Sequence, residues 1–136
     1  MELRIFLLAD FANESAGKLN VIGAFNTINA RQFPAIHPAM YLVAKIAAEL
    51  GEFEVERKIN VLHFDEDGKE LMKMEGTFAF PKPQPGHSSE GTFIFGIRDM
   101  KFDKPSRHEF RLLVDNHLLG VVPLEIVQLE TSAQAN

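Results

Sequence analysis

The aspartates that lie near predicted turns are the residues of this chain best suited to bind a cation. Carboxylate and amide oxygens are the ligands that proteins offer to Ca²⁺, and loops that share one end of a fold can supply them to an ion or a small ligand. The candidate loop residues are Asp10, Asp65, Asp67, Asp115 and Asn116. The Asp-x-Asp-x-Asp-Gly spacing of a dedicated calcium loop is absent, and acidic residues before glycine also serve turn geometry alone. We therefore expect turn formation to be their main role, and we expect no bound cofactor or metal.

The histidines are candidate bases or zinc ligands, but their spacing indicates neither role. No two of them have the short separation by which one element binds zinc. They are His37, His63, His87, His108 and His117. We expect His63 and His108 to occupy strands. His37 lies between Pro34 and Pro38, where a ring hydrogen bond would hold a rigid crossover, so it is the candidate structural or site histidine.

The serines lie in predicted loops or in the tail, and none belongs to a nucleophile-elbow motif. A serine nucleophile requires a histidine base and a third group that orients the base. The glycines are dispersed along the chain, so the sequence contains no phosphate-binding loop. We therefore expect that this protein is not an enzyme.

Length and composition predict one globular domain. The chain has 136 residues, of which 46% are apolar and 24% charged, and a chain of this size can bury a sizeable core. Cysteine is absent, which suits a reducing compartment such as the cytoplasm. We predict a single domain over residues 1–130 and a frayed polar tail over residues 131–136.

Charge and hydropathy argue against two classes of partner. A net charge of −5 disfavours general affinity for nucleic acid or anionic lipid, because both bind clustered lysines and arginines. No segment approaches the roughly 20 apolar residues of a membrane-spanning helix. The first apolar run follows Glu2 and ends at Asp10, which favours a strand over a signal peptide. We expect a soluble cytoplasmic protein.

Alternation of apolar and polar residues predicts about eight β-strands. The segments are 2–9, 18–25, 39–50, 53–61, 70–80, 92–97, 108–114 and 119–129. The clearest alternation is in 53–61, where we expect Phe53, Val55, Ile59 and Val61 to face inward. Segment 39–50 mixes residues that favour helix with residues that favour strand. A helix there would be apolar on nearly every side and would lack an N-cap residue, so we favour a strand.

Turns and loops separate these strands. Gly68 and the pair Asp115 and Asn116 tolerate a left-handed backbone and predict hairpin turns. Residues 26–38 indicate a long crossover between sheets, and residues 99–106 indicate a connection. Three prolines in residues 81–89 predict an exposed loop. The fold predicted from these features is all-β: an antiparallel β-sandwich of about eight strands, immunoglobulin-like or C2-like.

Two of the predicted strands carry phenylalanines at alternate positions. Phe78 and Phe80 share one face of the first strand, and Phe93 and Phe95 share one face of the second. A sandwich core needs about this many large side chains, so we expect them to be buried; on an exposed face they would form an interaction patch. The unpaired edge strands offer a separate route to assembly, because an edge can add a strand from a second subunit or an extended peptide.

Several stretches of the sequence resemble a known family. They are residues 7–10 (LLAD), residues 17–25 (GKLNVIGAF), Phe33-Pro34 with His37-Pro38, and residues 110–116 (FRLLVDN) continuing through Gly120 and Pro123-Leu124. Together they resemble a family of small bacterial proteins classified only as a domain of unknown function. The resemblance implies a bacterial source and a compact β-rich fold, and it supplies no catalytic residues.

The function that we expect from the sequence is a non-enzymatic binding or assembly module. Its partner would be another protein or a second copy of the chain, in a homodimer formed through a sheet edge or face. The alternative is a sandwich that binds a small ligand or calcium with the end loops around Asp10, Asp65, Asp67 and Asp115. A hydrolase built from His37, Asp10 and loop residues is the third and weakest alternative.

Overall fold

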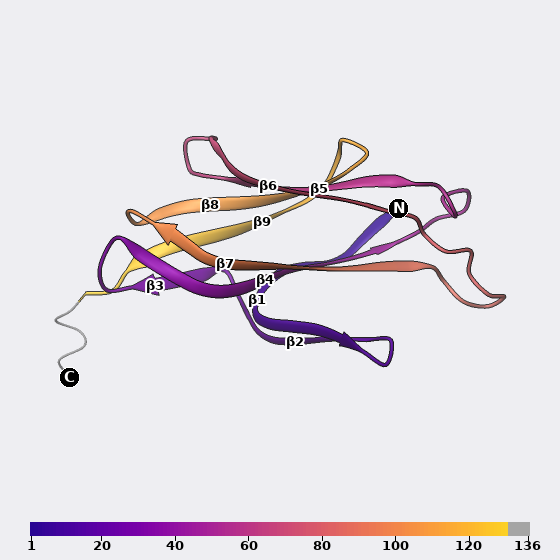
Figure 1. Ribbon diagram of the computed structural model, residues 1–136, viewed down its shortest axis with the longest axis horizontal. Helices are drawn as coiled ribbons and strands as arrows, with labels where there is room; N and C mark the ends of the chain where they lie inside the picture. Colours follow the sequence, from indigo (N-terminus) through magenta and orange to yellow (C-terminus); the bar gives the residue numbers. More distant parts are fainter. Residues whose placement is uncertain (131–136) are drawn as a thin grey trace.

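The computed structural model describes residues 1–130 and shows them as two β-sheets without a helix. The strands in this range are β1 (Glu2–Ser15), β2 (Lys18–Phe25), β3 (Thr27–Ala30), β4 (Ala35–Ala47), β5 (Arg57–Phe64), β6 (Glu70–Phe78), β7 (Glu90–Phe102), β8 (Ser106–Val114) and β9 (His117–Gln128). The predicted all-β sandwich is confirmed (Figure 1). The predicted tail, residues 131–136, lies outside the described residues. Over the described range, the structure offers no helix with the length and apolar character needed to cross a membrane.

The two sheets are built in different strand orders. One has four strands in the order β2-β1-β4-β7, and the other has five in the order β3-β9-β8-β5-β6. The chain leaves the first sheet after β2, adds the short strand β3 to the second sheet and returns as β4. Residues 26–38 are thus the predicted crossover, but they also contain a strand that pairs in parallel with β9. The described chain therefore has nine strands where we expected about eight.

Residues 39–47 of the ambiguous segment 39–50 form most of β4, which ends at Ala47. Met40, Leu42 and Ala44 alternate along the strand and are buried in the core between the sheets. Tyr41 and Val43 lie on the opposite face, in register with β1 and β7. Val43 is fully buried on that face, between Leu7 of β1 and Ile94 of β7. Both faces of β4 therefore carry buried apolar side chains, which explains why its sequence lacks a clear alternation.

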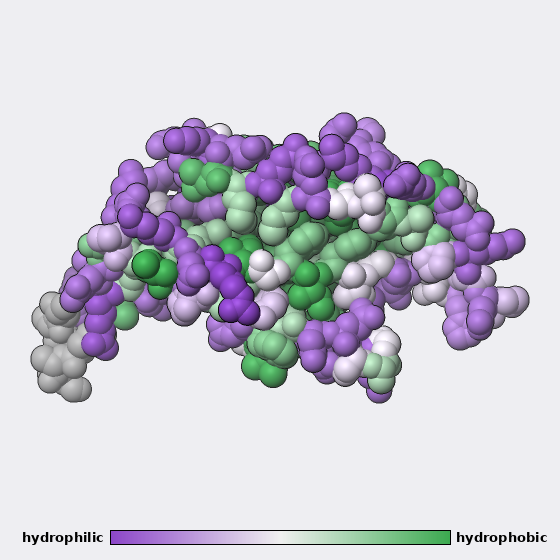
Figure 2. All heavy atoms as spheres, in the orientation of Figure 1, coloured by the Kyte–Doolittle hydropathy of each residue, from purple (hydrophilic) through white to green (hydrophobic). Residues whose placement is uncertain are grey.

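The core lies between the facing sheets. Phe80 and Phe110 are fully buried there, and burial of side chains of this size stabilises a fold by roughly 1.5–3 kcal/mol each. Phe78, Phe93 and Phe95 are partly buried and pack against the same cluster, so the alternating phenylalanines are core residues. Figure 2 shows apolar side chains along the middle of one face of the molecule, with polar side chains around them.

The segment with the clearest alternation, 53–61, is only partly a strand. The strand β5 begins at Arg57, and Val55, which we expected to face inward, is 46% exposed. Glu54 has a positive φ of 59°, which ends the extended run, while Phe53 bridges to Phe80. Ile59 faces the core as predicted. An irregular backbone thus overrides the alternation in the first half of the segment.

The strand β7 is longer than the segment 92–97 from which we predicted it. It pairs with β4 over the full length of both strands, from Glu90 opposite Ala47 to Phe102 opposite Ala35. Asp99 has a positive φ of 52°, and the strand continues beyond it. The predicted connection 99–106 therefore shrinks to residues 103–105, because pairing with β4 holds the residues after Asp99 in the sheet.

The hairpin turns lie where the sequence places them. Gly68 has φ of 80°, and Asp115 and Asn116 have φ of 50° and 65°, the left-handed values that we expected. The strands β1 and β2 form the predicted first hairpin. The proline-rich residues 81–89 contain no strand.

Candidate functional site

The predicted end-loop residues do not meet at one end of the sandwich. Asp65 and Asp67 lie in the turn after β5, whereas Asp115 and Asn116 lie in the turn after β8. The strands β5 and β8 are antiparallel neighbours, with Phe64 opposite Glu109 and Ile59 opposite Val114. The two turns are therefore at opposite ends of the sheet, roughly 20 Å apart at the rise per residue of a strand.

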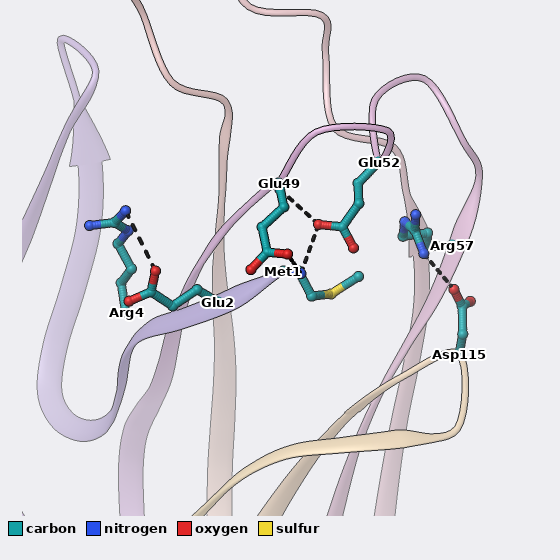
Figure 3. Close-up of polar contacts among 7 residues, drawn as sticks. All are labelled: Met1, Glu2, Arg4, Glu49, Glu52, Arg57 and Asp115. Atoms are coloured by element: carbon teal, nitrogen blue, oxygen red, sulfur yellow. Dashed lines mark hydrogen bonds and ion pairs between the residues drawn. The ribbon is translucent and has the colours of Figure 1, made fainter.

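Asp65 and Asp115 each accept hydrogen bonds from nearby backbone. One oxygen of Asp65 accepts hydrogen bonds from the backbone N–H groups of Lys69 and Asp67, each at 2.9 Å. These bonds, with that from Lys69 foremost, hold the pKa of the Asp65 carboxyl below its usual value. Asp115 accepts a hydrogen bond from the backbone N–H of Lys58 at 3.0 Å. It also accepts one from Arg57 Nη1 at 3.1 Å (Figure 3). These contacts match a turn-forming role for Asp65 and Asp115.

The other two candidates lie in the four-stranded sheet. Asp10 is in β1, where its carboxylate lies against Gly23 of β2; a side chain at Gly23 would collide with it. His37 is in β4, with its ring 5.8 Å from the ring of Phe25. Its Nε2 is buried without a hydrogen-bond partner. Across the described part of the chain, no three His, Cys, Asp or Glu residues gather into a group that could hold a metal.

A chain of hydrogen bonds joins Ser106, His108 and His63. His63 Nε2 lies 2.9 Å from His108 Nδ1, and His108 Nε2 lies 2.8 Å from Ser106 Oγ. His63 is 3% exposed and His108 is 7% exposed. The order of groups is hydroxyl, imidazole, imidazole, so protons can be exchanged along the chain according to the tautomer of each ring.

Strand pairing explains how these residues meet. His63 lies on β5 directly opposite Phe110 on β8, and His108 precedes Phe110 by two positions on the same face. The two histidines are thus diagonal neighbours across an antiparallel pair, within reach of each other. The ring of His63 stacks on Phe110 at 4.6 Å, and Phe102 contacts the ring of His108 at 5.1 Å. In the sequence, the only signal for this contact was that both histidines occupy core-facing positions of predicted strands. Recognising the contact also required the order of the strands in the sheet.

Burial keeps both imidazoles neutral at pH 7. Loss of hydration, and secondarily the neighbouring His108, lower the pKa of His63 from 6.5 to about 4. Burial also lowers the pKa of His108, although the nearby carboxylates of Asp65 and Glu66 oppose this. A neutral imidazole has one nitrogen that can accept a proton, so the hydrogen-bonded series of side chains contains a base.

Two hollows adjoin this hydrogen-bonded chain. One has a volume of about 350 Å³ and is bounded by Arg107, Val121 and Pro123 together with His108. The other has a volume of about 310 Å³, and Ser106 and His108 both line it. Asp65 and Glu66 border both hollows. The Ser106 hydroxyl, at one end of the hydrogen-bonded series, therefore lies beside a space that can admit a small molecule.

The edge strand β7 is the second feature with functional potential. Among the described strands that form sheet edges, β3 has four residues, β2 has eight and begins with the charged Lys18, and β6 carries an exposed Lys73–Glu75 ion pair at 2.8 Å. The strand β7 has 13 residues, and residues 91–97 bear no charge. Charges and short lengths protect sheet edges against strand addition. Over residues 91–97, β7 has neither protection.

Nine strands in two facing sheets define this protein as a β-sandwich. The chain belongs to the family of unknown function DUF6941, whose model matches residues 4–127. No curated protein matches the sequence significantly.

A solved structure of the Pseudomonas fluorescens alkylpurine DNA glycosylase AlkC, bound to DNA containing an abasic site analog, is similar in fold. The sequence identity is 14% and the TM-score is 0.52. The match covers 93% of this chain but only 30% of the glycosylase chain. The similarity therefore concerns the fold of one part of that protein.

Proposed function

We propose that this protein is an assembly module that forms a homodimer by antiparallel pairing of β7 with β7 of a second copy. The observation that carries the proposal is a long edge strand whose residues 91–97 have no charge. The free N–H and C=O groups of such an edge recruit another strand. Pairing would satisfy these groups and join two four-stranded sheets into one continuous sheet.

The charges that flank this segment specify one register. If the pairing is centred on Ile94, Glu90 of each copy lies opposite Arg98 of the other. Opposite charges that face each other across a strand pair stabilise it, and a two-fold axis repeats the contact at both ends. Arg98 is exposed, and it forms no ion pair among the described residues. Glu90 lies 3.5 Å from Lys45 of β4, and in the dimer its carboxylate would face both cations. The positive φ of Asp99 ends the regular segment just after this residue.

The apolar side chains of β7 suit the same register on both faces. On the outer face, Ile94 lies in register with Val43 of β4 and would meet Ile94 of the second copy. On the inner face, Phe93 would lie opposite Phe95 of the second copy. Both phenylalanines are partly exposed at the margin of the core, so pairing would extend the core across the interface. Each aromatic cross-strand pair contributes roughly 0.2–1 kcal/mol.

Substitution Ile94→Lys tests the proposal. It places two ammonium groups opposite each other at the two-fold axis, where like charges destabilise the pair. We expect the dissociation constant of the dimer to rise at least about tenfold. Sedimentation velocity or light scattering over a concentration series measures this change. The partly exposed position of Ile94 on the outer face lets the lysine extend into water in the monomer, so the fold should be retained.

Ile22→Lys is the matched control. Ile22 is 62% exposed and lies on β2, at the opposite edge of the same sheet. We expect this variant to dimerise like the unmodified protein. A protein that is monomeric at every concentration, or a dimer that Ile22→Lys disrupts and Ile94→Lys does not, would contradict the proposal.

The proposal includes a cytoplasmic setting in a bacterium. Lack of cysteine supports a reducing compartment, and the resemblance to small bacterial proteins supports the source. The net charge of −5 supports a protein partner over nucleic acid, since repulsion of phosphates opposes general binding.

A further inference from the structure

The hydroxyl of Ser106 and the two buried imidazoles have the order of a serine hydrolase: nucleophile, base and a group that orients the base. We propose that Ser106 is a nucleophile toward small carboxylic esters, with His108 as its base and His63 as a positioning residue. This inference goes beyond assembly through β7, and it reverses the expectation that the protein is not an enzyme.

The geometry of the hydroxyl favours transfer of its proton to His108. Ser106 Oγ has two acceptors within reach, His108 Nε2 at 2.8 Å and the backbone oxygen of Lys104 at 3.2 Å. The imidazole is the nearer of the two. When the hydroxyl donates to His108 Nε2, His108 carries its own proton on Nδ1 and donates it to His63 Nε2, at 2.9 Å. Every step of the chain then has one donor and one acceptor.

Packing fixes both rings in this arrangement. His63 stacks on Phe110 with an interplanar angle of 13°, and the ring of Phe102 meets His108 at 83°. Both histidines are buried, so their rings have little freedom to rotate away from Ser106. A base that is held in place and neutral loses little entropy when it accepts a proton.

The space beside the hydroxyl suits a small substrate with a carbonyl group. Ser106 and His108 line the hollow of about 310 Å³, together with three lysines and the carboxylates of Asp65, Glu66, Asp67 and Asp103. Lys101 pairs with Asp103 at 3.8 Å and Lys104 with Glu66 at 3.4 Å, whereas Lys69 forms no ion pair among the described residues. An ammonium group beside a reacting carbonyl stabilises the negative charge that develops on its oxygen, and Lys69 is the lysine of this hollow that is available for that role. The volume is at the lower end of the range for ligand sites, which favours esters of short acids.

The reaction consumes one ester and one water. Ser106 Oγ bonds to the carbonyl carbon, and its proton moves to His108 Nε2. The bond between the carbonyl carbon and the ester oxygen breaks, and His108 gives the proton to the leaving alkoxide. Water then attacks the acyl-serine with His108 as base again, which releases the acid and restores the Ser106 hydroxyl.

A fluorophosphonate probe tests the nucleophile directly on the unmodified protein. Such a probe reacts with activated serines, and peptide mass spectrometry identifies the modified residue. We expect Ser106 to be labelled roughly 100-fold faster than Ser15, the gain typical of a positioned base. Ser15 is exposed and its hydroxyl accepts a hydrogen bond from Asn20, with no histidine involved. Labelling of Ser106 no faster than that of Ser15 would overturn the proposal.

Two histidine variants separate the base from its positioning residue. His108→Gln should reduce labelling of Ser106 to the level of Ser15. His63→Phe keeps a stacked ring but no acceptor, so we expect labelling about tenfold slower, while His63→Gln, which keeps an acceptor, should recover part of the rate. Thermal unfolding confirms that each variant is folded. If folded His108→Gln is labelled at Ser106 as fast as the unmodified protein, the assignment of the base is wrong.

Discussion

Replacing Phe110 with alanine should lower the free energy of unfolding by about 3–5 kcal/mol, the range for removal of a buried aromatic ring. Phe110 has no exposed surface, and it lies on β8 near the middle of the five-stranded sheet. Its ring also supports the stacked ring of His63. The substitution therefore leaves a cavity and removes the surface that holds a buried imidazole in place.

Urea denaturation monitored by circular dichroism measures this loss. Phe11→Ala is the matched control, because Phe11 is 42% exposed on the outer side of the sandwich and contacts Tyr41. We expect the control to lose about 1 kcal/mol or less. Equal losses in the two variants would show that the space between the sheets is not the core.

Acidification should destabilise the protein by about 3 kcal/mol between pH 6.5 and pH 4 through His63 alone. Burial depresses the pKa of His63 in the folded protein from 6.5 to about 4. In this interval the unfolded chain binds a proton at His63 and the folded chain does not, so stability is present above pH 6.5 and falls as the pH is lowered. His108, whose pKa is also lowered by burial, adds to the same trend, whereas Asp65 and Glu66 oppose it at His108.

Denaturation at a series of pH values checks this expectation. His63→Phe removes the titrating group but keeps a ring on Phe110, so its stability should fall less steeply than that of the unmodified protein between pH 6.5 and pH 5. Lys73→Gln, a change of an exposed charged side chain on β6, should leave the slope unchanged. An unfolding free energy of the unmodified protein that is constant from pH 7 to pH 5 would contradict the buried, neutral state of His63.

The hairpin turns were predicted correctly from local sequence. The left-handed turn at Asp115 and Asn116 and the turn at Gly68 follow from residues that tolerate positive φ. The segment 39–50 was assigned to a strand because a helix there would be apolar on nearly every side and would lack an N-cap residue. Prediction failed for two reasons. The strand β7 extends to Phe102 because β4 offers partners over that length, and no feature of residues 99–106 reveals it. In the segment 53–61, the positive φ of Glu54 interrupts the predicted strand, and β5 begins at Arg57.

Predicting the candidate site requires the order and register of the strands even more than predicting the fold does. His63 and His108 are 45 positions apart, and they meet only because β5 lies beside β8 in one particular register. For the same reason the sequence placed Asp65 and Asp115 in one possible ligand site, whereas strand order puts them at opposite ends of the sheet. Residue types indicated which side chains could do chemistry, but strand order decided which of them meet.

The most direct test of the assembly proposal is a cysteine scan of β7, because the natural sequence has no cysteine. In the proposed register Ile94→Cys faces its own copy, with Cβ atoms about 4.5–5.5 Å apart, close to the separation in a disulfide. Thr92→Cys would lie opposite residue 96 of the second copy, roughly 13 Å from its counterpart. Mild oxidation should convert Ile94→Cys, and not Thr92→Cys, to a covalent dimer on a non-reducing gel. Equal yields at both positions, or no covalent dimer at either, would contradict pairing of β7 about Ile94.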